Sequence, residues 1–310
     1  MRTLQEGELV VETTLSCVSP GTELRELSLL QREGVDIVPT VPGYVKIGRV
    51  LHAGTSGLQE GQRVVITGPA DTGPYKARWG GHVSHSIVKA NGVISIPDGI
   101  DDYQAALARL AAISCHGFRL TPKRAEDHVA VIGLGAIGLF AAKFYECHGH
   151  HIVGFDRSPQ RVELARHWGI KAEIVTETVA EHIHRQFENG ADIIVDATGI
   201  SAVAVDAING LFMPPKQKPL QQLSRYVVQG SYPDVLTLPY DPFFQHQTMV
   251  LFPRDWEPND LHMTFELINK KQLNFPSSLC TIHKPEEASE VYRKLGDRQT
   301  SLVTALFRWV

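Results

Sequence analysis

Residues 129–156 read VAVIGLGAIGLFAAKFYECHGHHIVGFD, and this stretch decides the fold of the second half of the chain. The apolar run Val129–Ile132 predicts a buried strand, and the glycine turn GLGAIG at 133–138 follows it directly. A helical stretch comes next, and a second apolar run, Ile152–Phe155, ends in Asp156. A lone GxGxxG motif is weak support, but the strand before it, the helix after it and the acid behind the next strand complete a dinucleotide-binding fingerprint.

Each residue of the glycine turn has a predicted role. Gly133 permits the tight turn, Gly135 lets the backbone approach a pyrophosphate, and Gly138 lets helix and strand pack closely. Ala136 and Ile137 lie in the first helical turn, where unpaired N–H groups and the helix dipole favour a phosphate. The alternative is a glycine-rich turn in a βαβ unit that binds no nucleotide.

Asp156 predicts which coenzyme binds. Its carboxylate would accept hydrogen bonds from the adenosine ribose hydroxyls, and it would repel a 2′-phosphate, so NAD is favoured over NADP. The neighbouring Arg157 weakens this preference, because a guanidinium there could pair with a phosphate.

The composition is that of a soluble enzyme. Hydrophobic residues make up 43% and charged residues 21% of the 310 residues, as in ordinary globular proteins with room for two domains. The net charge of −4 gives no reason to expect binding to nucleic acid or to a membrane surface. The N-terminus has acids where a signal peptide would be basic, and no apolar run reaches the length of a membrane span. We therefore expect a cytoplasmic protein with a small-molecule substrate. Four scattered cysteines are expected to be reduced thiols: Cys17, Cys115, Cys147 and Cys280.

The pattern of secondary structure changes along the chain. Residues 1–116 show short apolar alternations separated by Gly, Pro and Asp turns, which predicts a compact, barrel-like β domain. Asp101–Arg119 has helical periodicity. From about residue 128, strands and helices alternate, which predicts a doubly wound parallel sheet and an α/β fold class. Further strands are expected at 171–175, 191–197, 225–230, 247–252 and 303–309, and further helices from Ser158-Pro159, at 261–271 and at 285–295.

This order of domains resembles the medium-chain dehydrogenase/reductase superfamily, and several local motifs carry the resemblance. Ser19-Pro20-Gly21-Thr22-Glu23 looks like the family's Cys-Gly-Thr-Asp site, and Val41-Pro42-Gly43-Tyr44 looks like its Pro…Gly-His-Glu segment. Gly61-Gln62-Arg63-Val64 and Gly80-Gly81-His82-Val83 resemble two further family segments. The resemblance implies a GroES-like catalytic domain formed by 1–116 and 276–310, and a Rossmann dinucleotide-binding domain formed by 117–275.

The chain departs from the family at the catalytic zinc. The three ligand positions of the family fall on Pro20, Tyr44 and about Leu110, and none of these side chains can ligate zinc. We therefore expect no metal. Within the zinc-free branch, the motifs are most similar to those of bacteriochlorophyllide a dehydrogenase-like proteins, which oxidise a hydroxyethyl group on a tetrapyrrole with NAD. The resemblance thus implies a zinc-independent, NAD-dependent oxidoreductase that moves a hydride between a secondary alcohol or ketone and nicotinamide.

By the same resemblance, three residues are candidates for the chemistry. Tyr44 takes the histidine position and would exchange a proton with the substrate oxygen, and Thr22 takes the position of a hydroxyl relay. Glu23 replaces an acid beside the metal, and Arg25 or the nicotinamide would supply the positive charge that a phenol needs to act as a base. The alternatives are a Tyr44 that only caps the β core, and a helix N-terminus formed by Thr22 and Glu23.

Four further residues are expected at the cofactor. Ser114 aligns with a family hydroxyl that contacts the nicotinamide. Thr198 and Gly199 follow a strand at the carboxyl edge of the sheet, where ligands bind in such folds, and Gly230 follows the next strand.

Other interpretations stay open. The chain is alternatively an NADPH-dependent enoyl or quinone reductase, since those relatives also lack zinc, or a catalytically inactive dinucleotide-binding protein. The apolar segment 246–253 suits an edge strand that pairs with a second copy, so a homodimer is expected.

Overall fold

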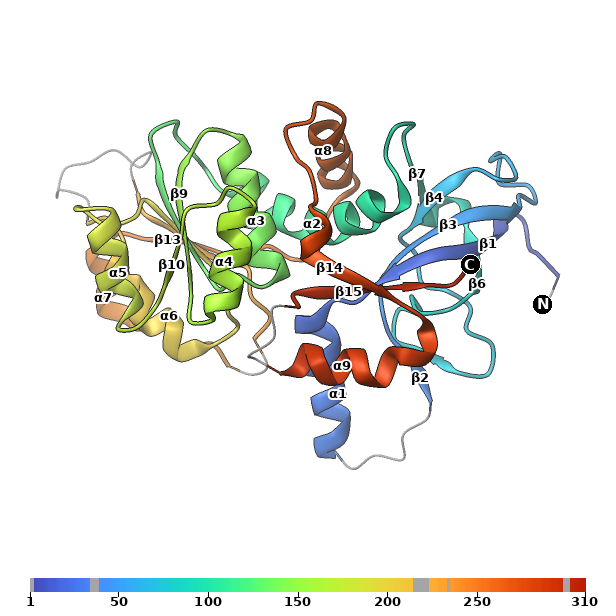
Figure 1. Cartoon of the computed structure of the whole chain (residues 1–310), viewed down its shortest axis with the longest axis horizontal. Coiled ribbons are helices and arrows are strands. Elements are labelled where there is room, and N and C mark those ends of the chain that lie inside the picture. The colour runs from blue at the N-terminus through green and yellow to red at the C-terminus, as the bar shows by residue number, and fades with distance from the viewer. Residues whose placement is uncertain (1–2, 34–38, 214–222, 233–234, 298–301) are drawn as a thin grey trace. The chain divides into compact units, whose positions relative to one another are not determined.

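The computed structural model describes all residues except 1–2, 34–38, 214–222, 233–234 and 298–301 (Figure 1). The chain forms two compact units, which we call the first unit (Met1–Leu110 with Phe265–Val310) and the second unit (Ala111–Thr264). Two helices, α2 (Asp102–Leu120) and α8 (Pro258–Asn269), run across the divisions between them. The domain limits expected from the sequence, 1–116 with 276–310 and 117–275, stay a prediction.

The second unit is built on a six-stranded parallel sheet with the strand order β10-β9-β8-β11-β12-β13 (Figure 1). Chain order therefore reverses between β8 and β11, which is the switch point of a doubly wound parallel sheet. The strands are β8 (His128–Ile132), β9 (His151–Asp156), β10 (Ala172–Ile174), β11 (Ile193–Asp196), β12 (Arg225–Val228) and β13 (Met249–Leu251).

Helices cover both faces of this sheet. The strand residues Ala130, Val153 and Ile194 belong to one buried apolar cluster with side chains of α5, α6 and α7. Figure 1 shows α3 and α4 on the opposite face. The helices are α3 (Ala136–Cys147), α4 (Pro159–His167), α5 (Val179–Gln186), α6 (Ser201–Ala207) and α7 (Tyr240–Gln245).

The start of α4 confirms the prediction from Ser158-Pro159. The Ser158 hydroxyl accepts the Arg161 N–H, and Pro159 takes the first helical position, where a missing N–H costs nothing. The predicted strands also form, but most are one to three residues shorter than expected, because the ladder stops where the chain turns away.

The first unit is built on a seven-stranded mixed sheet. Its main path runs β14-β15-β1-β3-β4-β7, and β6 pairs with β1. All pairs are antiparallel except β14 with β15. The strands are β1 (Glu8–Cys17), β3 (Val45–His52), β4 (Arg63–Ile66), β6 (His85–Lys89), β7 (Val93–Ser95), β14 (Cys280–His283) and β15 (Thr304–Arg308), with a small parallel pair of β2 (Thr40–Val41) and β5 (Lys76–Ala77) beside them.

Two helices complete the first unit, α1 (Pro20–Glu33) and α9 (Ala288–Gly296). Val18, Val291 and Phe307 are buried together where α9 packs on β15. The helix expected at 285–295 begins later than predicted, because Pro285–Glu287 forms a 3₁₀ turn before α9. A parallel sheet in one unit and a mixed sheet in the other confirm the α/β fold class.

Among the described residues, no helix combines the length and apolar character that crossing a membrane requires.

All four cysteines are free thiols in the structure. Burial raises the pKa of Cys115 to about 12 and that of Cys280 to about 11, so these thiols stay protonated at neutral pH.

Candidate functional site

The glycine turn has the geometry that its sequence predicts. Gly133 has a φ of 86°, which favours glycine, and its N–H donates to Phe155 O at 2.8 Å. A Cβ on Gly138 would lie 1.8 Å from Gly133 O, so only glycine lets α3 pack this closely on the turn. The turn is therefore tied both to β9 and to the helix that follows it.

Gly135 differs from the other two glycines. It is the N-cap residue of α3, and a Cβ built on it would meet nothing within 4 Å. The backbone conformation also needs no glycine there, since φ is −71°. In the part of the chain that the structure describes, no contact requires this glycine, whereas an anion drawn to the first N–H groups of α3, from Ala136 and Ile137 onward, would need the open space. The residues present thus fit a bound pyrophosphate.

Asp156 ends β9 and is bound to the turn. Its Oδ2 accepts the Leu134 N–H at 2.7 Å, and its Oδ1 accepts the Ser158 N–H at 2.8 Å. A carboxylate has about four acceptor sites, so ribose hydroxyls can still bind. Arg157 is exposed, whereas Arg161, which the sequence reasoning missed, places Nη1 3.8 Å from Asp156 Oδ2. Arg161 lies one helical turn after Ser158, the N-cap of α4, and this spacing was the signal in the sequence that could have identified it.

The carboxyl ends of β11 and β12 are packed backbone to backbone. A Cβ on Gly230 would lie 2.5 Å from Gly199 N, and a Cβ on Gly199 would lie 2.5 Å from Ser231 O. Thr198 donates its hydroxyl to Asp196 Oδ1 at 2.7 Å. These residues follow the strand ends beside the switch point, where a dinucleotide lies in such sheets.

Asp196 is a buried centre of hydrogen bonds that sequence reasoning did not identify. The carboxylate is fully buried, and its Oδ2 accepts hydrogen bonds from the hydroxyls of Tyr226 and Tyr232. Burial, and then the Asp196 charge, raise the pKa of both phenols. Both tyrosines therefore remain donors and fix the turn that carries Thr198.

Ser114, expected at the nicotinamide, is fully buried in α2. Its hydroxyl donates to Ile137 O at 2.8 Å and so connects α2 to the first turn of α3. A contact with the cofactor stays a prediction.

In the first unit, Tyr44 lies in a polar and aromatic setting. Its hydroxyl donates to Ser19 Oγ at 2.6 Å, and its ring packs edge-on to Trp79 with the centroids 5.8 Å apart. The guanidinium carbon of Arg109 lies 5.3 Å from the centroid of the Tyr44 ring. Tyr44 is half-buried. The hydroxyl beside the phenol is therefore Ser19, one turn before Thr22.

Thr22 and Glu23 lie in the first turn of α1. The Thr22 N–H donates to Ser19 O at 3.1 Å, as at an ordinary helix start. Glu23 is 3% exposed, and its carboxylate accepts the Ser19 N–H and lies 3.0 Å from His82 Nε2, with the Tyr292 hydroxyl as a further donor. Glu23 thus joins α1 and α9, and catalytic roles for both residues stay predictions.

His82 connects Glu23 to Ser16, whose Oγ lies 2.8 Å from His82 Nδ1. A serine, a histidine and an acid in series are the elements of an acyl-transfer triad. Ser16 is fully buried, however, and its Oγ accepts the Trp309 Nε1–H at 2.9 Å. A substrate cannot reach this hydroxyl, so the series is a structural network.

The three positions that match the zinc ligands of the family, Pro20, Tyr44 and Leu110, hold no zinc-binding side chain. Pro20 begins α1, Leu110 is fully buried, and the Tyr44 phenol is bound to Ser19. Burial raises the pKa of the nearby thiol Cys17, so it is not a ready thiolate ligand. The Arg109 guanidinium, beside Tyr44, puts a positive charge where a cation would need anionic ligands.

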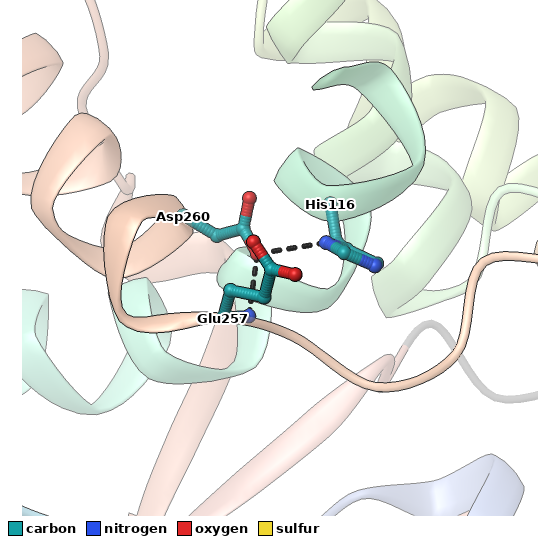
Figure 2. Close-up of side chains that lie close together, drawn as sticks. All are labelled: His116, Glu257 and Asp260. Carbon is teal, nitrogen blue, oxygen red and sulfur yellow. Dashed lines mark hydrogen bonds and ion pairs between the residues drawn. The ribbon is translucent and has the colours of Figure 1, made fainter. Parts of the chain in front are cut away.

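Among the described residues, one group of three side chains could hold a metal: His116, Glu257 and Asp260, whose candidate ligand atoms all lie within 4.8 Å (Figure 2). Asp260 already accepts hydrogen bonds from Arg119 Nη1 at 2.6 Å and from the Glu257 N–H at 2.6 Å. His116 Nδ1 lies 3.0 Å from the same carboxylate. A guanidinium on Asp260 competes with a metal ion, so we interpret this group as an ion pair between α2 and α8.

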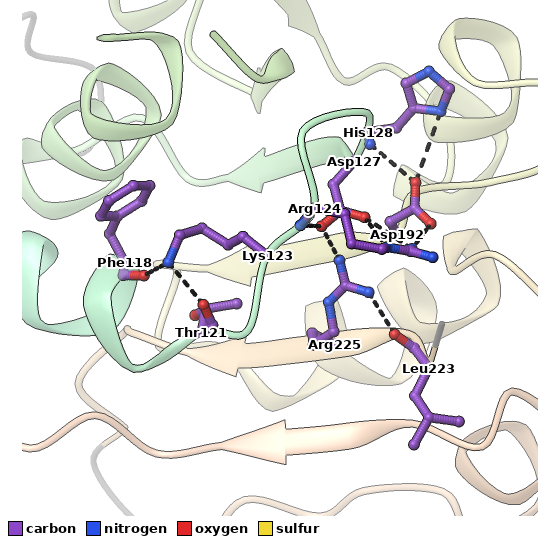
Figure 3. Close-up of polar contacts among 9 residues, drawn as sticks. All are labelled: Phe118, Thr121, Lys123, Arg124, Asp127, His128, Asp192, Leu223 and Arg225. Carbon is purple, nitrogen blue, oxygen red and sulfur yellow. Dashed lines mark hydrogen bonds and ion pairs between the residues drawn. The ribbon is translucent and has the colours of Figure 1, made fainter. Parts of the chain in front are cut away.

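A second charged network lies at the amino edge of the parallel sheet (Figure 3). Asp127, just before β8, is 1% exposed and is ion-paired with Arg225, which begins β12 and is 3% exposed. Arg124 bridges Asp127 and Asp192, at 2.8 Å and 2.7 Å. Because Gly133 follows the other end of β8, this network stabilises the sheet away from the glycine turn.

Comparisons with known proteins bear on the fold and on the resemblance. Residues 136–211 match the family described as zinc-binding dehydrogenase. The chain is 25% identical to 2-desacetyl-2-hydroxyethyl bacteriochlorophyllide A dehydrogenase of Cereibacter sphaeroides, over 92% of this chain and 86% of that protein.

Two solved structures show the same fold. The 2R,3R-butanediol dehydrogenase of Bacillus subtilis aligns with a TM-score of 0.79 at 18% identity, over 99% of this chain and 94% of that one. The acetophenone reductase of Geotrichum candidum, solved with NAD, aligns with a TM-score of 0.76 at 18% identity, over 99% and 91%. These findings confirm the expected resemblance and the combination of Rossmann and GroES-like folds.

Proposed function

From the confirmed resemblance to medium-chain dehydrogenases/reductases, we propose that this chain is an NAD-dependent, zinc-independent oxidoreductase. It would interconvert a secondary alcohol and a ketone. The observation that carries the proposal is the carboxylate of Asp156, bound to the glycine turn at Leu134 beside the open space over Gly135. In dinucleotide-binding folds, features of these two kinds bind the ribose and the pyrophosphate.

When bound, the oxidised nicotinamide accepts a hydride from the carbinol carbon. The protein would then hold the cofactor and accept the proton of the alcohol. Gly135, Ala136 and Ile137 would hold the phosphates, Asp156 the adenosine ribose, and Ser114, Thr198, Gly199 and Gly230 the other half of the dinucleotide.

Tyr44 is the proposed acid and base. Its hydroxyl hydrogen-bonds to Ser19 Oγ, and the Ser19 hydroxyl can turn to donate once the phenol has lost its proton. The N–H of Ser19 is fixed by Glu23, so the relay has a defined orientation. Thr22 remains an alternative relay from the same helical turn.

The substrate is proposed by analogy. The relative from Cereibacter sphaeroides is named for a hydroxyethyl-bearing bacteriochlorophyllide, so a bulky hydroxyethyl compound belongs in the substrate panel. Purified protein is mixed with NAD or NADP and a panel of secondary alcohols, and absorbance at the nicotinamide band is followed. Turnover with NAD that falls at least a hundredfold in Tyr44→Phe supports the proposal.

The same assay addresses the other interpretations. Reduction of an enoyl or quinone substrate by NADPH alone would favour the reductase alternative. Coenzyme binding without any turnover would favour an inactive binding protein. Activity that survives a chelator, in protein whose zinc content is far below one per chain, supports independence from zinc.

We also propose a homodimer formed through β13. This strand is at the edge of the parallel sheet, and its neighbour Phe252 is 62% exposed. Tyr240 and Phe244 of α7 are exposed as well and stack with centroids 5.5 Å apart. Light scattering should give twice the chain mass, and Phe252→Asp should reduce it, whereas Leu51→Asp, at an exposed apolar residue of β3, should not.

A further inference from the structure

Arg109 is a buried cation that the proposed mechanism has not yet used. It lies in α2, directly before Leu110, the position matched to a metal ligand of the related enzymes. Its side chain is 2% exposed, and its guanidinium carbon lies 5.3 Å from the centroid of the Tyr44 ring. A guanidinium keeps its charge at every pH at which proteins are folded. A fixed positive charge therefore adjoins the phenol.

Other described groups near Tyr44 come from the start of α1 and from β3. Ser19, just before α1, is neutral, and Glu23 in α1 has His82 and Tyr292 as partners. On β3, Lys46 is 1% exposed and donates to Gly80 O at 3.0 Å.

Lys46 and Arg78 are two other cations to compare with Arg109. Burial lowers the pKa of Lys46 to about 7, so that cation is only partly charged near neutral pH. In the loop before Gly80, Arg78 lies over Trp79 at 5.0 Å and pairs with Glu26 at 2.9 Å. Of the cations named here, Arg109 combines a permanent charge with direct contact to the Tyr44 ring.

We propose that Arg109 is a positioning residue that supplies, through Tyr44, the positive charge that zinc supplies in related enzymes. It stabilises the Tyr44 phenolate, which then works as the base. This inference rests on the proposed function. The substrate O–H bond breaks and its proton moves to Tyr44 Oη; the electron pair left on oxygen forms the carbonyl as the hydride leaves the carbinol carbon for oxidised NAD. Two electrons leave the alcohol, and two enter the coenzyme.

A fixed positive charge beside a phenol favours the phenolate, so it lowers the pKa of the phenol below its usual value near ~10. Tyr44 should therefore titrate at a lower pH than a free tyrosine does.

The test is a pH titration of the full chain carrying tyrosine labelled with ¹³C at Cζ, followed by NMR without substrate or coenzyme. Tyr44→Phe assigns the signal. Arg109→Met should raise the Tyr44 midpoint by at least one unit, Arg109→Lys should restore most of the shift, and Lys46→Met should move it by less than half a unit. A wild-type midpoint at or above 10, or a midpoint that Arg109→Met leaves unchanged, overturns the inference. If Arg109→Met does not fold, the wild-type midpoint decides, with a value below 10 in support.

This titration separates the inference from the proposed function. A lowered midpoint in a protein without dehydrogenase activity would keep the inference and refute the function. Turnover with an ordinary Tyr44 midpoint would do the reverse. In an active protein, the pH profile of kcat/KM for alcohol oxidation has an acidic limb. The midpoint of that limb should lie at higher pH in Arg109→Met, by the same number of pH units as the NMR midpoint.

Discussion

Two glycines three residues apart should respond in opposite ways to the same added methyl group. In Gly135→Ala the new Cβ meets nothing within 4 Å, and the φ of −71° suits alanine. Alanine restricts the unfolded chain, which stabilises by about 0.4–1 kcal/mol, but it is a poorer N-cap than glycine by a similar amount. The free energy of unfolding should therefore change by less than about 1 kcal/mol. The methyl group would instead occupy the space of the pyrophosphate, and NAD affinity should fall by about tenfold to a hundredfold, or about 1.4–2.8 kcal/mol.

Gly138→Ala is the matched opposite. Its Cβ would lie 1.8 Å from Gly133 O and 3.2 Å from Ala197 Cβ, so α3 must move away from the turn. Overpacking of this kind costs about 1–3 kcal/mol, which lowers Tm by several degrees in a unit of this size. Thermal denaturation and calorimetric titration with NAD measure both quantities on each variant. If Gly135→Ala bound NAD as tightly as the wild type, the pyrophosphate would not lie against this backbone, and the main argument for a coenzyme would fail.

Four further predictions use other parts of the structure. In Asp156→Ser, the Kd for NADP divided by the Kd for NAD should fall by about tenfold or more, because Arg157 and Arg161 remain as cations that can pair with a 2′-phosphate. Fluorescence titration measures both Kd values, and an unchanged ratio would contradict the proposed role of Asp156. Asp127→Ala leaves Arg225 buried without its carboxylate and should cost about 3–5 kcal/mol in urea unfolding, while NAD affinity of the folded protein stays within twofold. In the folded state, burial lowers the pKa of Lys46 to about 7, so between about pH 7 and pH 10 the unfolded state binds more protons than the folded state. The free energy of unfolding should therefore rise with pH, by about 3 kcal/mol more between pH 7 and 9.5 than in Lys46→Met. Parallel curves of stability against pH for the two proteins would refute this. Native Cys17 and Cys115 should resist alkylation at pH 8 for as long as the chain is folded, since burial raises both thiol pKa values, and mass spectrometry after a timed pulse would detect any early labelling.

The parallel sheet was predictable because its signals are local. The apolar run at 129–132, the glycine turn and Asp156 fix one βαβ unit within 28 consecutive residues, counted from 129 through 156. Parallel strands must then cross over in one hand, so the strand order follows from few choices. The predicted strand ends were less accurate, because a ladder stops where its neighbour stops, and the sequence of one strand does not contain that information.

The surroundings of Tyr44 could not be predicted for the same reason. Ser19, Trp79 and Arg109 come from three separate segments, and only the tertiary fold brings them to one phenol. The sequence offered Arg25, two residues beyond Glu23, or the nicotinamide as the source of the positive charge, and it did not identify Arg109. In the structure Arg25 is 33% exposed and lies 3.5 Å from Glu26.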